Sequence, residues 1–207
     1  MARQPVLRPR IAAAALSGDP ELGPWIERIG PVRIPHRPEP AFAYLVRAIC
    51  YQQLAGAAAS TIHGRFVAAL GGAVEPETVI RAAEPDLRAA GVSAAKLRAI
   101  RDLADKSVSG EVPLHDLQGL TDEAIVDRLT RVIGIGEWTA QMFLLFRLRR
   151  PDVWPTGDLG VRAGYARIHG LAEVPSAREM TALGERFRPW RSAAAWYCYR
   201  ALDVEEP

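Results

Sequence analysis

The 207-residue sequence has little cysteine, little lysine and no long apolar run. Its two cysteines, Cys50 and Cys198, are too few for a disulfide framework or a four-cysteine iron–sulfur cluster. No stretch reaches the roughly eighteen apolar residues that a membrane-spanning helix needs. The opening MARQPVLRPR lacks the apolar segment of a secretory signal. We therefore expect a soluble, cytoplasmic protein without an iron–sulfur cofactor.

The positive charge is carried almost entirely by arginine. Lys96 and Lys106 are the only lysines among 26 basic residues, and 24 acidic residues bring the net charge to +2. Arginine suits phosphate, but its abundance also follows coding bias, so the charge permits a nucleic-acid partner without requiring one. The histidines show no metal-ligand spacing, which predicts no catalytic metal. They are His36, His63, His115 and His169.

Apolar residues recur at helical spacing along the chain, and no segment alternates in the manner of a strand. The pattern predicts an all-α protein of short helices. Ser93 and Thr121 can each cap a helix, and Ser176 with Glu179 can form a capping box. Without internal repeats or a long linker, residues 1–207 should form one compact unit with two helical lobes and a central groove.

A glycine turn interrupts the helical pattern of the segment 129–146, LTRVIGIGEWTAQMFLLF. Gly134 and Gly136 flank Ile135, and glycine lets a backbone come close to an external group. The next helix should begin near Glu137, so free amides would face outward at its positive end. Such a turn can bind phosphate, although an ordinary helix–helix connection also favours glycine.

The loop 151–164 carries a second motif. Prolines and a glycine before Asp158 favour a loop, and a helix can begin at Leu159 with Asp158 as its N-cap. Considered alone, capping is a sufficient explanation for this aspartate.

Together, GIGEWTAQ and WPTGDLGVR, with Trp138 and Asp158 twenty residues apart, resemble the helix-hairpin-helix (HhH-GPD) DNA glycosylases, particularly the 3-methyladenine glycosylase II branch. The resemblance extends upstream to AICYQQLAGAAASTI and downstream to RPWRSAAAWYCYRAL, from Asp19 to Leu202. It implies an enzyme that flips a damaged nucleotide out of double-stranded DNA and hydrolyses its N-glycosidic bond.

The resemblance also implies roles for single residues. Asp158, kept ionised by the helix dipole, would be the catalytic carboxylate that stabilises a cationic sugar or helps to activate water. Trp138 would stack on the base, and the alternative interpretation of this residue is a buried tryptophan in the core. Gln53 and Leu54 would be the wedge that fills the gap in the duplex, with a core position as the alternative for Leu54.

The remaining implied positions complete a pocket and a DNA-binding turn. Met142 and Leu159 stand where the best-known bacterial member of the branch leads us to expect tyrosines, which leaves the breadth of the substrate range open. The base pocket would comprise Trp138, Tyr199, Met142 and Leu159. The phosphate-binding hairpin would comprise Gly134, Ile135, Gly136 and Thr139. The backbone carbonyls of Thr130, Val132 and Ile135 would hold a monovalent cation.

Bifunctional relatives carry a Schiff-base lysine where this chain has Trp138, and neither lysine lies near the motif, so we expect no strand-cleaving lyase activity. The shortage of cysteine argues against the endonuclease III and adenine-mismatch branches. About forty residues precede the first motif helix, too few for an extra N-terminal α/β domain. We expect a monomer associated with the nucleoid.

Two alternatives remain: a non-catalytic helix-hairpin-helix module that binds DNA, and a helical protein with an unrelated partner. The presence of Asp158 and Trp138 at matching places counts against the first. Salt-dependent DNA binding would exclude the second.

Overall fold

The computed structural model describes residues 4–35 and 37–207, and all the regular secondary structure in these ranges is helical. This confirms the all-α prediction. The chain divides into two compact units. One is built from Arg37–Ala140, and the other combines residues 4–35 with Gln141–Pro207. His36, considered above for metal binding, lies outside the described residues.

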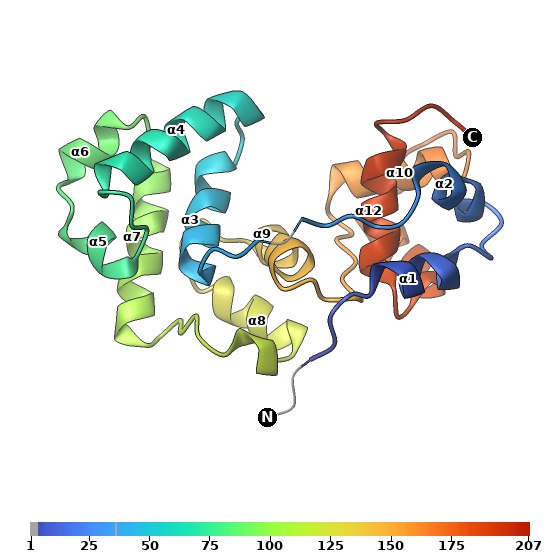
Figure 1. Ribbon diagram of the computed structural model, residues 1–207, viewed down its shortest axis with the longest axis horizontal. Helices are drawn as coiled ribbons and strands as arrows, with labels where there is room; N and C mark the ends of the chain where they lie inside the picture. The colour runs from blue at the N-terminus through green and yellow to red at the C-terminus, as the bar shows by residue number, and fades with distance from the viewer. Residues whose placement is uncertain (1–3, 36) are drawn as a thin grey trace. The chain divides into compact units, whose positions relative to one another are not determined.

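The long helix α7 organises the first unit. It packs against α3 and α5, while α3 also packs against α4 (Figure 1). The predicted caps are confirmed, since Ser93 Oγ accepts from the Lys96 amide at 3.3 Å and Thr121 Oγ1 accepts from the Ala124 amide at 3.2 Å. The helices are α3 (Ala41–Tyr51), α4 (Gly56–Ala69), α5 (Pro76–Arg81), α6 (Glu84–Ala89), α7 (Ala94–Ser109), α8 (Asp122–Leu129) and the start of α9 (Glu137–Met142), with a 3₁₀ turn at Leu117–Gly119.

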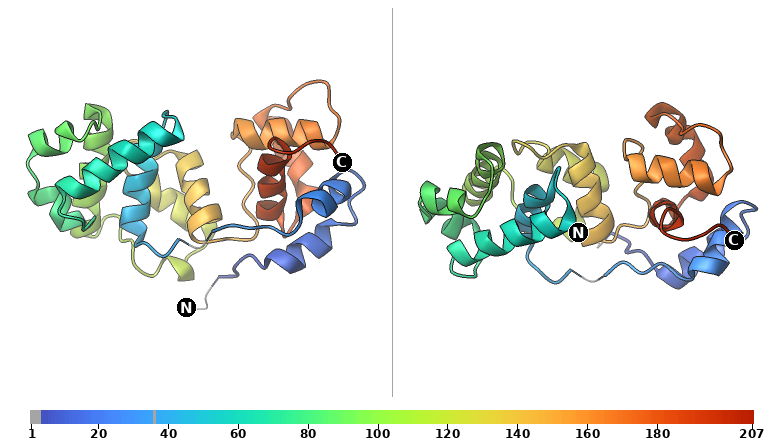
Figure 2. Two further views of the ribbon diagram at one scale, coloured as in Figure 1. Left: turned by 45° about the horizontal axis from the view of Figure 1, so that its top comes forward. Right: turned by 90° about the horizontal axis from the view of Figure 1, so that it is seen from above.

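The second unit is assembled around α12, whose buried residues lie on all its sides. The N-terminal helices α1 and α2 lie beside α12 although they come from the opposite end of the chain (Figure 2). Tyr197 secures this arrangement, because its hydroxyl donates to the Gly30 carbonyl at 3.0 Å. The helices are α1 (Pro9–Leu16), α2 (Leu22–Ile29), α10 (Leu159–Ile168), α11 (Ala177–Leu183) and α12 (Arg191–Ala201), with a π-helical turn at Phe143–Arg147 and a 3₁₀ turn at Gly184–Phe187.

A close approach of backbones joins α10 to α12. A Cβ added to Gly164 would overlap the backbone of Cys198, so only glycine permits this contact. The capping box predicted for α11 is also confirmed, with Ser176 and Glu179 each bonding the other's amide. No helix in the described ranges is both long and apolar enough to cross a membrane.

Candidate functional site

The two glycines of the hairpin have different structural settings. Gly134 adopts a φ of 78°, and a Cβ there would lie 3.1 Å from Ala99 Cβ, so the fold itself requires glycine. Gly136 has no such φ, and an added Cβ would meet nothing within 4 Å. The protein's own packing therefore leaves room at Gly136 for a group from outside.

Two charged side chains of α7 hold the hairpin in place. Asp102 Oδ2 accepts from the Ile133 amide at 2.8 Å and from Lys106 Nζ at 3.0 Å. Lys106 Nζ also donates to the Arg131 carbonyl at 2.6 Å. The expectation that both lysines lie away from the motif is therefore wrong, because folding brings Lys106 to a segment 25 positions along the chain.

The junction between α3 and α4 turns sharply at Gln53, whose φ is 56°. Leu54 is 40% exposed, which excludes the core alternative for this side chain. Gln52, rather than Gln53, reaches the hairpin, because its Nε2 group donates to the Gly134 carbonyl at 3.1 Å and to Thr139 Oγ1 at 3.3 Å. The Thr139 side chain is 5% exposed and faces into the unit.

Trp138 lies in the first turn of α9 and is 47% exposed. Its large apolar ring is therefore available at the surface of the first unit, and the core alternative does not describe it. Ile135 in the hairpin, by contrast, is buried, so it contributes to this turn through its backbone.

Asp158 begins α10 in the second unit. Its Oδ1 accepts from the Val161 amide at 2.9 Å, which confirms the predicted N-cap. The residue is only 7% exposed. A carboxylate in this position combines an interaction with the helix amides and shielding from solvent, so its charge acts over short distances more strongly than it would in water.

Tyr199 of α12 lies beside this carboxylate. A Cβ added to Gly160 would come within 2.9 Å of Tyr199 Cε1 and 3.1 Å of Asp158 Oδ1, so the absence of a side chain at 160 lets both groups share this space. Burial raises the pKa of Tyr199, and the negative charge of Asp158 raises it further. The Tyr199 hydroxyl also donates to Met142 Sδ at 3.7 Å. Leu159, predicted to line the same pocket, is 66% exposed.

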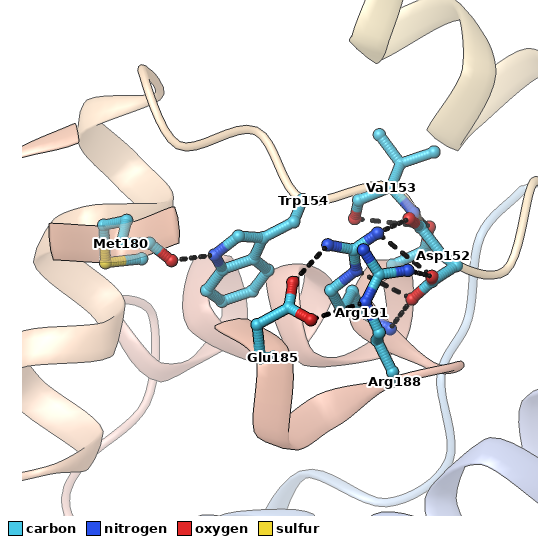
Figure 3. A network of polar contacts seen from close by, with 8 residues as sticks. Asp152, Val153, Trp154, Met180, Glu185, Arg188 and Arg191 are labelled. Atoms are coloured by element: carbon cyan, nitrogen blue, oxygen red, sulfur yellow. Dashed lines mark hydrogen bonds and ion pairs between the residues drawn. The ribbon is translucent and has the colours of Figure 1, made fainter. Parts of the chain in front are cut away.

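The loop that leads to Asp158 is fixed at three consecutive residues (Figure 3). Asp152 Oδ1 accepts from Arg191 Nε at 2.8 Å and Asp152 Oδ2 from Arg191 Nη2 at 3.0 Å. Ser192 Oγ accepts from the Val153 amide at 2.9 Å, and the Trp154 indole donates to a carbonyl of α11 at 2.7 Å. These contacts were not predicted from the sequence, and they make the loop a rigid support for the aspartate.

Neither cysteine is available for chemistry, since both are buried. Burial raises the pKa of Cys50 to about 11, although Lys96 opposes the shift, and burial also raises the pKa of Cys198. In the described part of the chain, no three histidine, cysteine, aspartate or glutamate side chains are grouped so that they could hold a metal ion.

A comparison with known proteins assigns the family. Residues 46–189, which include both the hairpin and the Asp158 loop, match the HhH-GPD superfamily of base excision DNA repair proteins. The chain belongs to this superfamily. DNA-3-methyladenine glycosylase 1 of Schizosaccharomyces pombe is 36% identical over 179 residues, which are 85% of this chain and 78% of that relative.

Solved structures of other HhH-GPD-like proteins superpose on most of the chain. The S. pombe 3-methyladenine DNA glycosylase Mag1, in complex with abasic DNA, matches with a TM-score of 0.82 and 32% identity, over 95% of this chain and 98% of that one. The DNA-3-methyladenine glycosidase of Bacillus halodurans matches with a TM-score of 0.83 and 33% identity, over 97% and 92%. The all-α HhH-GPD fold is therefore shared along nearly the whole sequence.

Proposed function

We propose that this HhH-GPD chain is a monofunctional DNA glycosylase that hydrolyses the N-glycosidic bond of alkylated purines, of the 3-methyladenine and 7-methylguanine type. The observation that carries the proposal is the buried carboxylate of Asp158, held at the start of α10 beside Tyr199. The 3-methyladenine activity in the names of the relatives supports this substrate class.

The reaction breaks the bond between C1′ and the base nitrogen, and the electron pair of that bond leaves with the base. Water then forms the new bond to C1′ and releases a proton. Positive charge develops on the sugar as the bond lengthens, and the negative charge of Asp158 would stabilise it. An alkylated purine that is already cationic leaves as a neutral base, so the site would need no strong general acid.

Access to the base would depend on residues of the first unit. The exposed Gln53 and Leu54 would fill the space that the flipped nucleotide leaves, which offsets part of the few kcal/mol that unstacking costs. Trp138 would stack on the flipped base, and a cationic purine gains from both stacking and cation–π attraction.

The hairpin would bind the DNA backbone, because the open space at Gly136 would let a phosphate approach its amides. A monovalent cation would add to this site through the carbonyls of Thr130, Val132 and Ile135. The Val132 carbonyl already accepts from the Ile135 amide at 3.1 Å, and its second lone pair is the one that a cation would use.

We also propose that the chain acts as a monomer without lyase activity. The family resemblance places Trp138 at the position where bifunctional relatives would carry their lysine. The ammonium groups of Lys96 and Lys106 both donate to backbone carbonyls, and these contacts favour the protonated form over the neutral amine that a Schiff base would require.

Mass spectrometry of the bases that the purified protein releases from DNA treated with a methylating agent tests the proposal. We expect methylated purines to be released by the wild type and not by Asp158→Asn. Salt-dependent DNA binding without any base release would instead identify a non-catalytic DNA-binding module.

A further inference from the structure

One glutamine side chain joins the wedge segment to the hairpin within the first unit. The Gln52 amide donates both to the Gly134 carbonyl at 3.1 Å and to Thr139 Oγ1 at 3.3 Å. Its partners are 82 and 87 positions away in the sequence. Gln52 is also the residue immediately before Gln53 and Leu54, so it binds the hairpin at the foot of the wedge.

Lys96 fixes the backbone from which Gln52 projects. Its Nζ donates to the Cys50 carbonyl at 2.9 Å and to the Gln52 carbonyl at 2.7 Å. These carbonyls lie at the C-terminal end of α3, where an ammonium group also interacts favourably with the helix dipole. The junction is thus held from both its backbone and its side chain.

The same helix supports the hairpin. Lys96, Ala99, Asp102 and Lys106 follow one another on α7 at intervals of three, three and four residues, which places them on one face. Lys96 binds the junction, Ala99 packs against Gly134, and Asp102 with Lys106 binds the hairpin's leading turn. Gln52 closes a continuous ring of contacts through α7, the junction and the hairpin.

We infer that Gln52 is a positioning residue that couples the wedge of Gln53 and Leu54 to the DNA-binding hairpin. The wedge would then enter the duplex at a set distance from the strand that the hairpin holds. This inference rests on the proposed function, because it assigns a step in nucleotide flipping. Gln52 itself needs no contact with DNA, since its amide is used within the protein.

Loss of the Gln52 donor should affect flipping more than binding. The backbone amides of the hairpin stay in place, so the Kd for undamaged DNA should change by no more than about three-fold. The junction, however, loses two hydrogen bonds that hold its orientation. We expect base release in a single turnover to slow by about ten-fold, because orientation contributes directly to the rate of the bound complex.

The test uses the full chain and a duplex that carries 2-aminopurine next to the target position, whose fluorescence rises when it unstacks. Gln52→Met removes the hydrogen-bond donor and keeps similar bulk. Gln52→Glu also removes the donor and keeps the shape of the side chain, and it serves as the second variant if the methionine variant lowers Tm. Gln118→Met is the matched control, because it makes the same change in the same unit, within the turn Leu117–Gly119. Lys96→Met should slow base release as the Gln52 variants do, whereas Lys96→Arg, which keeps a charged donor, should retain most of the wild-type rate of base release.

Coupling is supported if both Gln52 variants slow the fluorescence rise and the base release about ten-fold, with Kd almost unchanged and the Gln118 variant like the wild type. It is overturned if they unstack 2-aminopurine at the wild-type rate, or if rate, DNA affinity and Tm all fall in parallel, as expected for a purely structural glutamine. A wild type that unstacks 2-aminopurine but releases no alkylated base would refute the proposed function, and the fluorescence would still decide the coupling.

Discussion

Replacing Asp158 with asparagine separates the two properties of this side chain. Oδ1 caps α10 through the Val161 amide at 2.9 Å, and asparagine caps helices about as well as aspartate, so the fold should lose less than about 0.5 kcal/mol. The negative charge is removed completely. Any large change in rate is then due to the charge and not to the helix.

The size of that change follows from the burial of Asp158, which is 7% exposed. At an effective dielectric constant of about 20, a carboxylate roughly 4 Å from a positively charged sugar carbon interacts with it by about 4 kcal/mol. This corresponds to about a thousand-fold in rate. We therefore expect Asp158→Asn to release methylated bases about a thousand times more slowly than the wild type.

Single-turnover base release, thermal unfolding and DNA binding measure the three consequences separately. Asp158→Ala is the matched variant, because it loses the cap as well as the charge and should be less stable by about a further 1 kcal/mol at a similar rate. Both variants should bind DNA like the wild type, since the hairpin is intact. Wild-type base release by Asp158→Asn, together with slow release by Asp158→Ala, would show that capping and not charge supports catalysis.

Three further changes test other parts of the structure. Gly136→Val should weaken binding to unrelated duplexes alike, by about ten-fold in a gel shift, because it fills the space at the hairpin; its Tm should not fall, since an added Cβ meets nothing within 4 Å. Gly164→Ala should lower the free energy of unfolding in urea by roughly 3 kcal/mol, because its Cβ overlaps the Cys198 backbone, whereas Gly64→Ala, with open space around it, should not. Burial, assisted by the positive charge of Arg186, lowers the pKa of His169 below its ordinary value of about 6.5. The unfolded chain then binds the proton more readily than the folded chain does. The contribution of His169 to the free energy of unfolding is therefore fully present above pH 6.5 and declines as the pH falls below it. His169→Phe should flatten that decline in Tm, and parallel profiles for the two proteins would contradict the assignment.

The lowered pKa of His169 also decides whether this side chain is an ion-pair partner or a neutral packing residue. Its Nδ1 lies 3.8 Å from Glu21 Oε2, which would be an ion pair only with a protonated imidazole. The ring instead packs against Tyr165 in a tilted arrangement, with centroids 4.0 Å apart, and its burial disfavours the charge. We therefore treat His169 as a neutral packing residue at pH 7.

The four helix caps that the sequence predicts depend only on neighbouring residues. Ser93, Thr121, Ser176 and Asp158 were all predicted as helix caps, and all four accept the expected backbone amide. Capping involves atoms within three positions of one another, so a short pattern contains nearly all the information that determines it. The extent of α9 was less predictable, because a π-helical turn replaces its continuation after Met142.

Long-range contacts were not available from the same patterns. Two adjacent glutamines look equivalent in the sequence, yet in the fold Gln52 bonds the hairpin while Gln53 adopts a left-handed φ of 56°. In the sequence, Lys96 and Lys106 were considered only as possible Schiff-base nucleophiles and set aside, although both donate to carbonyls of distant segments. Such contacts depend on how helices pack, which periodicity alone does not specify.

Gly136 and Asp158 share a property that links structure to chemistry. Glycine costs a chain about 0.5 to 1 kcal/mol of stability relative to alanine where the backbone has no need of it, and neither φ nor packing requires it at 136. A serine or threonine would likewise cap α10 without placing a negative charge beside Tyr199 in a buried setting. At both positions the residue exceeds what folding alone demands. The proposed function would give the reason in both cases, because a DNA phosphate would need room at the hairpin and a cationic sugar would need a carboxylate.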